Sequence, residues 1–500
     1  MKNKRITLSL LTLLGLSMAA CEKFLDQPVL GQFEAGAFFT SDANTILAVN
    51  AAYVPLSFRD AASNPIWVLG DVASDDAVKG SNPGDQADFD NIDQFNITPI
   101  NSAVEALWKR YYDGVFRCNV VLDGLPESNT RVSAGVRQQA MGQAQFLRAY
   151  YYFQLTTIYG RIPLRVKVET PAELQSPARD QSVIYAQIEA DCLAAANNLP
   201  ESWSGADQGR ATKGAALALL AKTYLYEQKW ALAAQTAQQV EGLGYKLLPV
   251  YADNFRAATK YNSEAIFAVQ HTSGLSPAQG NNLNQWFAPR QQNGYGFFHP
   301  TQSLVDNFEK APDGTPDPRL DYSIGREGQL FFGEPFDVNW STTGYLSKKH
   351  LQPLSEIPAA IKGDGDLNFQ AIRYAEVLLI DAEASNEAGN PTAALAALNQ
   401  VRKRARESYL NDPTLAGTGT VPEGLLPDIT TNDQGQLRDI IRQERRSEMA
   451  LEFQRYFDIM RYGEAYARQA LGTIPNFNYA QHRFYPIPQS ERDTNKRLFE

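Results

Sequence analysis

The sequence has few of the residues that usually build catalytic and metal centres. Its 500 residues include three cysteines and four histidines. The histidines stand far apart, and none has a cysteine or a second histidine at metal-ligand spacing (His271, His299, His350 and His482). The nucleophile motif Gly-x-Ser-x-Gly, a phosphate-binding loop and Gly-x-Gly-x-x-Gly are all missing. The sequence therefore predicts no zinc site and no cofactor, and none of these motifs indicates another metal site.

Cysteine usage also argues against a disulfide-stabilised fold. Cys118 and Cys192 lie in stretches rich in alanine and leucine that are typical of helices, so we expect buried thiols in preference to a disulfide. Positive charge is scarce as well. The 46 basic residues are outnumbered by 56 acidic ones, which gives a net charge of −10 and makes nucleic acid a poor partner.

The chain has one pronounced apolar run near its start, Ile6 to Leu16, and it is too short to span a bilayer. Three basic residues precede the run, and small residues lead to a cysteine after it (Lys2, Lys4 and Arg5; Met18-Ala19-Ala20-Cys21). This pattern predicts a lipoprotein signal peptide over residues 1–20, with Cys21 acylated after cleavage. Cleavage would take the net charge to −13. Met18 stands where such signals usually carry leucine, so an ordinary secretory signal is the alternative.

Helical periodicity dominates the first half of the mature chain. Residues 21–40 have no sustained period and indicate a tether, and residues 59–100 form a long polar loop of a kind that is often functional. Apolar spacing predicts helices over the ranges 42–53, 103–125, 136–159 and 183–199.

Two later stretches share a 12-residue spacing of small residues. Ala221 and Ala233 are separated by this distance in residues 212–240, and Ala382 and Ala394 in residues 372–401. Each stretch is interrupted midway by polar residues. The pattern predicts two helical hairpins of the tetratricopeptide type, in which small residues allow the paired helices to cross closely.

Between these hairpins, residues 245–368 are rich in glycine, proline and aromatic residues. We interpret them as an irregular lobe with short strands such as Ala265–Val269. Helix is predicted to return at Phe369 and again over residues 436–466. The expected organisation is a helical region over 41–244, the lobe over 245–368 and a second helical region over 369–500.

Two charged segments have a structural and a functional interpretation. Glu444-Arg445-Arg446-Ser447-Glu448 places acidic and basic side chains four residues apart on a helix, which favours ion pairs between stacked helices. Asp364-Gly365-Asp366-Leu367-Asn368 resembles the start of a calcium loop, but Phe369 and Ala375 replace its glycine and its bidentate glutamate. A solvated turn is the preferred interpretation, and a different calcium site is the alternative.

The sequence leaves one enzymatic hypothesis open, a glycosidase that uses a pair of carboxylates. Asp75 and Asp76 lie in the long N-terminal loop, where they could cap a turn, bind sugar hydroxyls or act as the two carboxylates of a glycosidase. Turn capping is the structural interpretation, and hydroxyl binding is the preferred functional one.

An ordered series of motifs resembles the SusD/RagB family of nutrient-uptake lipoproteins from Bacteroidetes. Cys21-Glu22-Lys23-Phe24-Leu25-Asp26 resembles the family's mature N-terminus. Further matching segments follow in family order along nearly the whole chain (Ala35–Tyr53, Phe146–Phe153, Tyr159–Leu164, Gly209–Ala216, Arg373–Leu379, Ala382–Ala384, Asn399–Arg402, Glu444–Arg446, Phe457–Arg461 and Pro486–Pro488). The chain departs from many relatives by ending at Glu500 without a Gln-Asn-containing tail.

The resemblance implies a mostly α fold, a tetratricopeptide-like scaffold with an inserted, ligand-facing irregular lobe. It also implies a non-catalytic, lipid-anchored protein on the outer-membrane surface. Such a protein captures an oligosaccharide or peptide and delivers it to a SusC-like TonB-dependent transporter. A glycan hydrolase and a transporter-bound scaffold without its own ligand site are the alternatives.

The family motifs are scaffold motifs, so ligand residues must be chosen on physical grounds. By analogy with relatives that stack sugar rings on aromatic faces, we expect ligand contacts from aromatic residues of the loop and lobe, with two carboxylates nearby (Trp67, Trp286, Tyr295 and Trp340; Asp75 and Asp76). Core packing is the alternative for each aromatic residue. Trp108 and Trp230 lie on predicted helices and are expected in the core.

Overall fold

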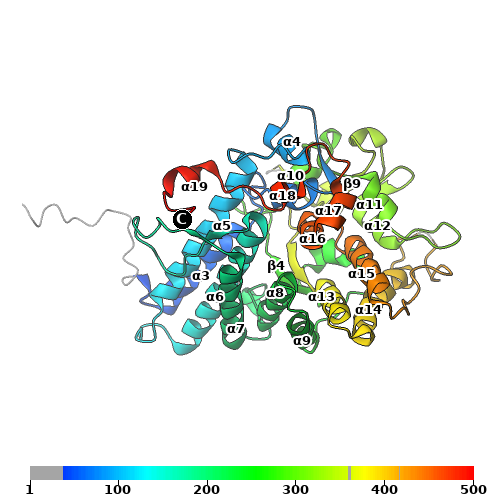
Figure 1. The fold of residues 1–500 in the computed structure, drawn as a ribbon. Coiled ribbons are helices and arrows are strands. Elements are labelled where there is room, and N and C mark those ends of the chain that lie inside the picture. Colours follow the sequence, from blue (N-terminus) through cyan, green and yellow to red (C-terminus); the bar gives the residue numbers. More distant parts are fainter. Residues whose placement is uncertain (1–37, 358–361, 416) are drawn as a thin grey trace, which may run out of the picture.

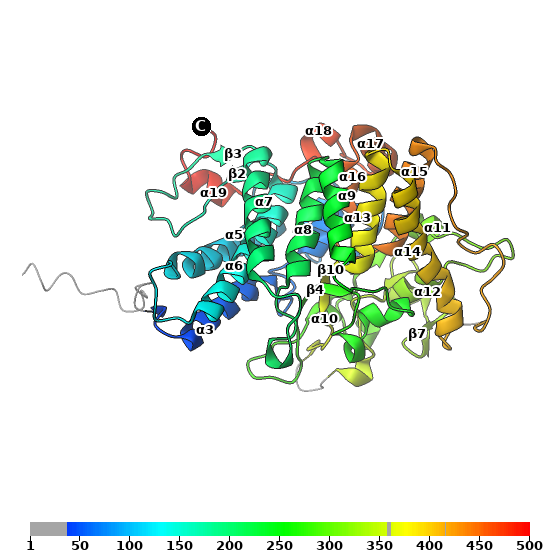
Figure 2. The same ribbon diagram turned by 90° about the horizontal axis from the view of Figure 1, so that it is seen from below.

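A computed structural model describes residues 38–357, 362–415 and 417–500. The predicted signal peptide, Cys21 and nearly all of the 21–40 tether lie outside the described residues. In the described part, long helices stand side by side in a row, and the short elements of the lobe lie along one side of that row (Figures 1 and 2). None of the described helices combines the length and apolar character needed to cross a membrane.

The helices occupy both ends of the sequence. The N-terminal part contains α3 (Asp42–Tyr53), α4 (Ala87–Asp93), α5 (Ser102–Gly124), α6 (Ala134–Tyr159), α7 (Gln181–Asn198), α8 (Lys213–Tyr226) and α9 (Trp230–Glu241). The C-terminal part contains α13 (Tyr374–Glu387), α14 (Pro391–Asn411), α15 (Gln434–Glu448), α16 (Arg455–Arg461), α17 (Glu464–Leu471), α18 (Tyr479–His482) and α19 (Gln489–Thr494). From α6 to α9 each helix packs against the next, and α9 continues the row through α13 to α14.

The predicted helical hairpins are confirmed as the pairs α8/α9 and α13/α14. The four small residues that suggested them are all fully buried (Ala221, Ala233, Ala382 and Ala394). Because an alanine adds only a methyl group, the paired helices can approach closely at these positions. The two hairpins adjoin where α9 packs on α13, which makes the row continuous although the lobe separates them in sequence.

The lobe consists of short elements, as predicted. Its helices are α10 (Leu283–Phe287), α11 (Gln302–Asn307) and α12 (Pro318–Ser323). Its strands are β4 (Ala265–Val269), β5 (Phe297–Pro300), β6 (Ile324–Gly325), β7 (Leu330–Phe331), β8 (Glu334–Pro335) and β9 (Leu346–Ser347). The pairs β6/β9 and β7/β8 are antiparallel, as is the pair β2 (Ile162–Pro163) and β3 (Ala178–Arg179) outside the lobe. The predicted strand Ala265–Val269 is confirmed.

The prediction that helix returns at Phe369 is wrong. Residues Phe369–Arg373 form strand β10, which pairs antiparallel with β4, and helix α13 begins at Tyr374. All five residues of β10 are buried, so pairing with β4 supplies hydrogen bonds that a buried backbone requires. This long-range pairing outweighs the local pattern.

The prediction of one helix over residues 436–466 is also wrong. Helix α15 ends at Glu448, and Leu451 and Phe453 adopt left-handed backbone conformations with φ of 61° and 66°. The Asp71 carboxylate accepts the Phe453 N–H at 2.8 Å and the Arg455 N–H at 3.0 Å, where α16 begins. Asp71, a residue of the N-terminal loop, therefore stabilises the turn between α15 and α16. Local periodicity could not predict this turn.

The long polar loop of residues 59–100 contains more structure than its sequence predicts. It forms a short π-helix, η2 (Val68–Val72), strand β1 (Ala77–Gly80) and helix α4. Strand β1 pairs antiparallel with β5 of the lobe, with Ala77 opposite Pro300 and Gly80 opposite Phe297. This pairing brings the N-terminal loop and the lobe together.

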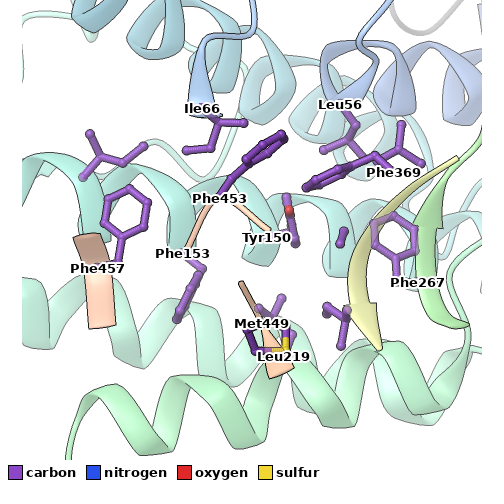
Figure 3. Close-up of a cluster of buried hydrophobic side chains, with 14 of the residues drawn as sticks. Leu56, Ile66, Tyr150, Phe153, Leu219, Phe267, Phe369, Met449, Phe453 and Phe457 are labelled. Carbon is purple, nitrogen blue, oxygen red and sulfur yellow. The ribbon is translucent and has the colours of Figure 1, made fainter. Parts of the chain in front are cut away.

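One core joins the two helical regions and the lobe. Figure 3 shows Phe453 of the C-terminal region among Leu56, Ile66 and Phe369, and its ring lies 5.4 Å from that of Phe369 at an angle of 11°. All three of these neighbours are buried, as is the core residue Trp108. Cys118 and Cys192 are buried free thiols, as expected.

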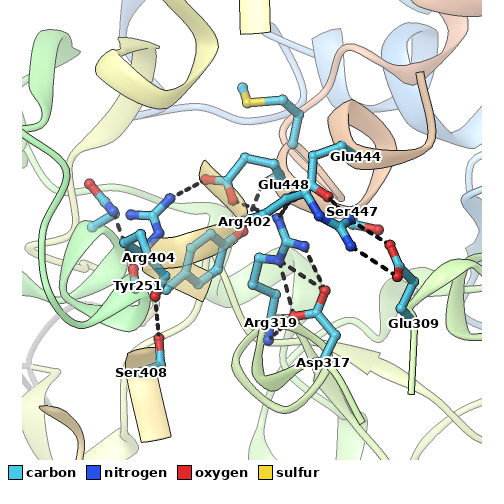
Figure 4. Close-up of polar contacts among 12 residues, drawn as sticks. Tyr251, Glu309, Asp317, Arg319, Arg402, Arg404, Ser408, Glu444, Ser447 and Glu448 are labelled. Carbon is cyan, nitrogen blue, oxygen red and sulfur yellow. Dashed lines mark hydrogen bonds and ion pairs between the residues drawn. The ribbon is translucent and has the colours of Figure 1, made fainter. Parts of the chain in front are cut away.

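The charged run at the end of α15 forms buried ion pairs, which confirms its structural interpretation. Arg319 of the lobe contacts Glu444 at 2.5 Å and Glu448 at 2.9 Å, and Arg402 of α14 contacts Glu444 at 2.8 Å (Figure 4). Arg373 adds a contact to Glu448 at 2.5 Å. These ions are almost fully buried, so their mutual contacts replace the water that each charge loses on folding.

Candidate ligand-binding site

Tyr295 is an exposed aromatic residue on a tightly held backbone. Its side chain and main chain together expose 38% of their surface. Its N–H donates to the Gln285 carbonyl at 2.8 Å, and its own carbonyl lies 2.8 Å from Ser81 Oγ. Gly296 N–H donates to the Ala288 carbonyl at 2.9 Å. The backbone that carries the ring therefore needs no ordering when a ligand arrives, and the Lys362 ammonium lies over the ring, 5.2 Å from its centroid.

The two glycines beside Tyr295 are required by this turn. A Cβ on Gly294 would lie 1.9 Å from the Ala288 carbonyl oxygen, which is far inside contact distance. Gly296 has φ of +68°, a conformation that favours glycine. The Gly-Tyr-Gly sequence thus fixes where the ring stands.

Polar groups connect the Tyr295 backbone to the N-terminal loop, because Ser81 Oγ donates to the Tyr295 carbonyl. Arg290 Nη2 donates to Ser81 Oγ at 2.9 Å and contacts the Asp85 carboxylate. The Arg290 and Asp85 side chains remain 43% and 39% exposed. A hydrogen bond from Ser81 lowers the pKa of Asp85, which keeps this carboxylate ionised at neutral pH. The pair offers both donors and acceptors to a polar ligand.

Trp340 belongs to the short 3-10 helix η7 (Val338–Trp340). A second 3-10 helix, η6 (Arg290–Gln292), contacts η7. The half-buried ring of Trp340 packs against Phe331 at 5.9 Å and Phe336 at 5.7 Å between centroids. Gln291 Nε2 donates to the Asn339 carbonyl at 3.4 Å, which ties η7 to η6. The segment that carries Trp340 is therefore attached to η6, which Tyr295 follows in the sequence.

A cavity of about 210 Å³ opens next to these residues. It lies between α10, the β7/β8 hairpin and the segment 351–355 (Asn284, Ala288, Gln292, Phe331, Phe332, Glu334, Leu351, Gln352, Pro353, Leu354 and Ser355). Asn284 is 3% exposed, and its Oδ1 accepts the Gln352 N–H at 2.8 Å. Its Nδ2 has no hydrogen-bond partner among the described residues. The cavity thus combines aromatic walls with a buried amide, whose Nδ2 packs against Gly365, where an added Cβ would lie 2.3 Å from it.

Two sequence models of one family match the chain. The model described as SusD family matches residues 263–500, and the model described as starch-binding associating with outer membrane matches residues 41–225. The chain belongs to the SusD/RagB family.

Relatives of known sequence and structure agree with this membership. SusD-like protein P2 of Formosa agariphila is 26% identical over 530 residues, covering 100% of this chain and 99% of that protein. A SusD-like carbohydrate binding protein from Bacteroides fragilis has a TM-score of 0.78 at 25% identity. A structure titled laminarin binding SusD-like protein has a TM-score of 0.74 at 27% identity. Each structural match covers 92% of this chain and 99% of the other.

The motif that most resembles the SusD/RagB family builds the scaffold. Phe146 to Phe153 lie in α6, and all eight residues are buried. Arg148 in its centre contacts the Asp191 carboxylate of α7 at 2.7 Å and donates to Asn119 Oδ1 of α5 at 2.9 Å. The motif therefore identifies the family through its packing and says nothing of the ligand.

Two of the predicted ligand residues lie in the core of this SusD/RagB protein, which corrects the sequence interpretation. Trp67 has no exposed surface, and its ring is surrounded by aromatic rings such as those of Phe89 and Phe287, at 5.3 and 5.2 Å. Trp286 is 6% exposed and meets Tyr295 edge to face at 5.6 Å. Trp67 has no face for a ligand, and Trp286 serves as support beneath Tyr295.

The predictions for Asp75 and Asp76 are also corrected, because the buried Arg455 and the partly buried Arg446 occupy their carboxylates. Arg455 contacts Asp75 through Nε at 2.8 Å and Nη2 at 3.0 Å, and Arg446 contacts Asp76 at 2.7 Å. Burial alone would raise the pKa of Asp75, but Arg455 and Arg446 hold it below its usual range. Burial raises the pKa of Asp76 against the opposing charge of Arg446. The pair fastens the N-terminal loop to the C-terminal region.

The calcium-like segment ties down a neighbouring loop. The Asp364 carboxylate accepts the N–H groups of Gly274 at 2.7 Å and Gly280 at 3.0 Å. Asp366 accepts the Ser273 N–H at 2.9 Å. These hydrogen bonds account for both carboxylates as parts of a turn, but Asp364 is only 4% exposed, so the prediction that the turn is solvated is wrong for this residue.

Sequence reasoning missed Asp85, Arg290 and Asn284 at this site. Each lies in a segment without periodicity, and only the β1/β5 pairing brings Asp85 to Arg290. The Gly-Tyr-Gly sequence around Tyr295 was the one local signal available, because paired glycines often mark a backbone that must turn sharply.

Proposed function

We propose that this SusD/RagB protein captures an oligosaccharide on the cell surface and delivers it to a SusC-like TonB-dependent transporter. The observation that carries the proposal is the exposed ring of Tyr295, held by backbone hydrogen bonds beside the Asp85–Arg290 pair. A sugar ring has an apolar face that stacks on an aromatic ring and hydroxyls at its edge that need donors and acceptors. Tyr295 and its polar neighbours offer both.

Trp340 and the adjoining cavity extend this surface beyond a single sugar ring. The half-buried indole belongs to η7, which Gln291 ties to η6, and Asn284, whose Nδ2 has no hydrogen-bond partner among the described residues, is one of the residues that line the cavity. Relatives named for carbohydrate and laminarin binding support a glycan over a peptide. We therefore propose Tyr295 and Trp340 as stacking residues, and Asp85, Arg290 and Asn284 as hydroxyl-binding residues.

Binding without cleavage fits the surface better than hydrolysis does. Asp85 is paired with Arg290, and Asp75 and Asp76 are buried with Arg455 and Arg446. A retaining or inverting glycosidase needs two carboxyl groups facing one glycosidic bond, one of them protonated. The scaffold alternative is less favoured, because a protein that binds only its transporter would have no role for the exposed Tyr295.

Calorimetric titration of the mature protein with laminarin and a panel of neutral oligosaccharides and peptides tests the proposal. We expect binding of at least one glycan, no product after long incubation, and a loss of affinity of about tenfold in Tyr295→Ala, equivalent to about 1.4 kcal/mol. Phe116→Ala, which truncates a 51% exposed aromatic residue on α5, is the matched control and should bind normally. Cleavage of the ligand, or equal affinity of both variants, would refute the proposal.

Delivery and anchoring need tests in cells. Labelling of intact cells with an impermeant reagent should reach the protein, and Cys21→Ala should release it from the membrane fraction. Co-purification with a SusC-like transporter but no affinity for any glycan or peptide would favour the scaffold alternative.

A further inference from the structure

A second cavity, of about 280 Å³, lies apart from the Tyr295 surface and is not used by the proposed function. Three segments form its walls: the end of α3 with the following turn, the turn at residues 206–210, and the end of β4 with the residues after it. Both α3 and β4 reach the edge of the helix row on which the lobe lies (Figure 2).

The floor of this cavity is apolar and its rim is rich in carboxamides. The apolar residues include Val54, Leu56, Ala268 and Val269. Four amide side chains stand around them (Asn50, Gln208, Gln270 and Gln279). Gln208 and Asn50 are exposed and make no side-chain hydrogen bond among the described residues. An apolar floor below several amides suits a sugar ring, whose faces are apolar and whose edge carries hydroxyls.

Gly209 keeps the cavity open. Its φ is +94°, and a Cβ at this position would lie 2.6 Å from Cδ of Gln270. Gln270 is itself held in place, because its Oε1 accepts from Asn368 Nδ2 at 2.7 Å and its Nε2 donates to the Ala268 carbonyl at 2.7 Å. The wall is therefore fixed before any ligand binds.

Arg59 supplies a positive charge that is not balanced by the protein. Its Nη1 contacts a neutral amide, Gln279 Oε1, at 3.5 Å, and no carboxylate among the described residues lies within 4.0 Å of its guanidinium. Asp60 next to it accepts the Ala62 N–H at 3.1 Å. Arg210, the other arginine of the cavity, is neutralised by Asp207 at 2.7 Å. In an acidic protein this leaves one guanidinium at the cavity free to pair with an anion.

We propose that this cavity is a second saccharide site, which takes one sugar unit bearing an anionic group, with Arg59 bound to the anion and the amides to the hydroxyls. Its volume is near the lower end of small-molecule sites, which limits the occupant to about one ring. The fork of a guanidinium pairs with both oxygens of a carboxylate, so a hexuronate is the favoured unit. A sulfated sugar also carries a negative charge, and the experiment below distinguishes it from a hexuronate.

The cavity is coupled to the lobe that carries Tyr295. Asn282, at the start of α10, donates its N–H to the Phe58 carbonyl at 2.9 Å, so the wall containing Arg59 is fixed to the base of α10. A ligand chain that contacted both surfaces would gain avidity without any new contact at either one. An acidic branched or mixed glycan would therefore bind more tightly than a neutral one.

Saturation-transfer NMR on the mature protein, with methyl glucuronide, methyl glucoside and galactose 6-sulfate as probes, tests the site. We expect methyl glucuronide to bind at least tenfold more tightly than methyl glucoside, and Arg59→Ala to remove this difference. Gln208→Ala should weaken glucuronide binding several-fold. Tighter binding of galactose 6-sulfate than of the glucuronide would overturn the hexuronate assignment and assign the site to a sulfated unit.

Two controls separate this site from the Tyr295 surface. Arg179→Ala removes an exposed arginine that has no ion pair among the described residues, and it should leave glucuronide binding unchanged. Tyr295→Ala should weaken neutral-glycan binding about tenfold but leave glucuronide binding unchanged. Failure of one proposal can therefore be detected independently of the other. Failure of the glucuronide to bind, equal binding of glucoside and glucuronide, or normal glucuronide binding by a folded Arg59→Ala would overturn the second site.

Discussion

Replacement of Asp75 and of Asp85 by asparagine should separate stability from binding in this protein. Asp75 accepts a two-pronged ion pair from Arg455, and the two side chains are only 10% and 5% exposed. Asp75→Asn removes the carboxylate that Arg455 contacts most closely and leaves Arg455 facing the Asp76 carboxylate, 3.8 Å from its Nε. Removal of one member of a buried ion pair costs about 3–5 kcal/mol, and the asparagine oxygen recovers part of that, so we expect a loss of about 2–4 kcal/mol. Asp85→Asn, with a 39% exposed side chain whose ion pair is screened by water, should have little effect on stability.

Thermal unfolding followed by fluorescence measures this difference. The entropy of unfolding is about 2.1 cal/mol/K per residue, so for a chain of this size 1 kcal/mol shifts Tm by roughly 1 °C. Asp75→Asn should therefore melt about 3 °C below the wild type and Asp85→Asn within about 1 °C of it. Glycan affinity should show the opposite order, with several-fold weaker binding only in Asp85→Asn.

The pH dependence of stability is a second test of the Asp75–Arg455 ion pair. Arg455 and Arg446 hold the pKa of Asp75 below its ordinary value of 3.8, so the stabilisation is complete above that pH. It disappears as the pH falls through the lowered value of the folded state. The gap in Tm between wild type and Asp75→Asn should shrink on acidification from pH 7 to pH 3. An unchanged Tm for Asp75→Asn at pH 7, or a hydrolytic activity that this variant abolishes, would refute the reasoning.

Two further predictions concern the Tyr295 turn and the buried histidines. Gly294→Ala places a methyl group on the Ala288 carbonyl and should weaken glycan binding about as much as Tyr295→Ala. Gly135→Ala, at a glycine with open space around it and an ordinary backbone conformation, should bind normally. Equal binding by both variants would show that the turn does not position the ring. Burial lowers the pKa of three histidines to about 4 (His271, His299 and His350). The unfolded chain therefore binds these protons first, and stability should fall as the pH drops from about 6.5 to 4, by about 3 kcal/mol for each histidine. Urea unfolding at pH 7, 5.5 and 4.5 measures this fall, and a flat profile would contradict the burial of these rings.

The helices were predictable from sequence because they bury continuous local stripes. The α6 motif and the paired alanines of α8/α9 and α13/α14 repeat at helical spacing, so each stretch contains the information that makes it helical. Phe369–Arg373 and the break after Glu448 were mispredicted for the opposite reason. Their conformations depend on β4 and on Asp71, which lie about 100 and nearly 400 residues away in sequence.

The binding surface was predictable only in part. The sequence indicated that the N-terminal loop and the aromatic lobe act together, and the β1/β5 pairing brings them together. It did not distinguish an exposed aromatic from a buried one, because Trp67, Trp286, Tyr295 and Trp340 all lie in segments without periodicity. Exposure is decided by what packs above a ring, and that is a property of the assembled chain.

The sequence by itself determined the family, the helical scaffold and the scarcity of catalytic motifs, since each depends on residue types at short, fixed spacings. The tertiary structure decided which side chains can meet a ligand. Asp75, Asp76 and Trp67 were candidates until buried arginines and aromatic rings were found around them, and Asp85, Arg290 and Arg59 became candidates through their exposure and partners. The physical reason is that burial and charge pairing depend on contacts between residues far apart in the chain, which no local pattern encodes.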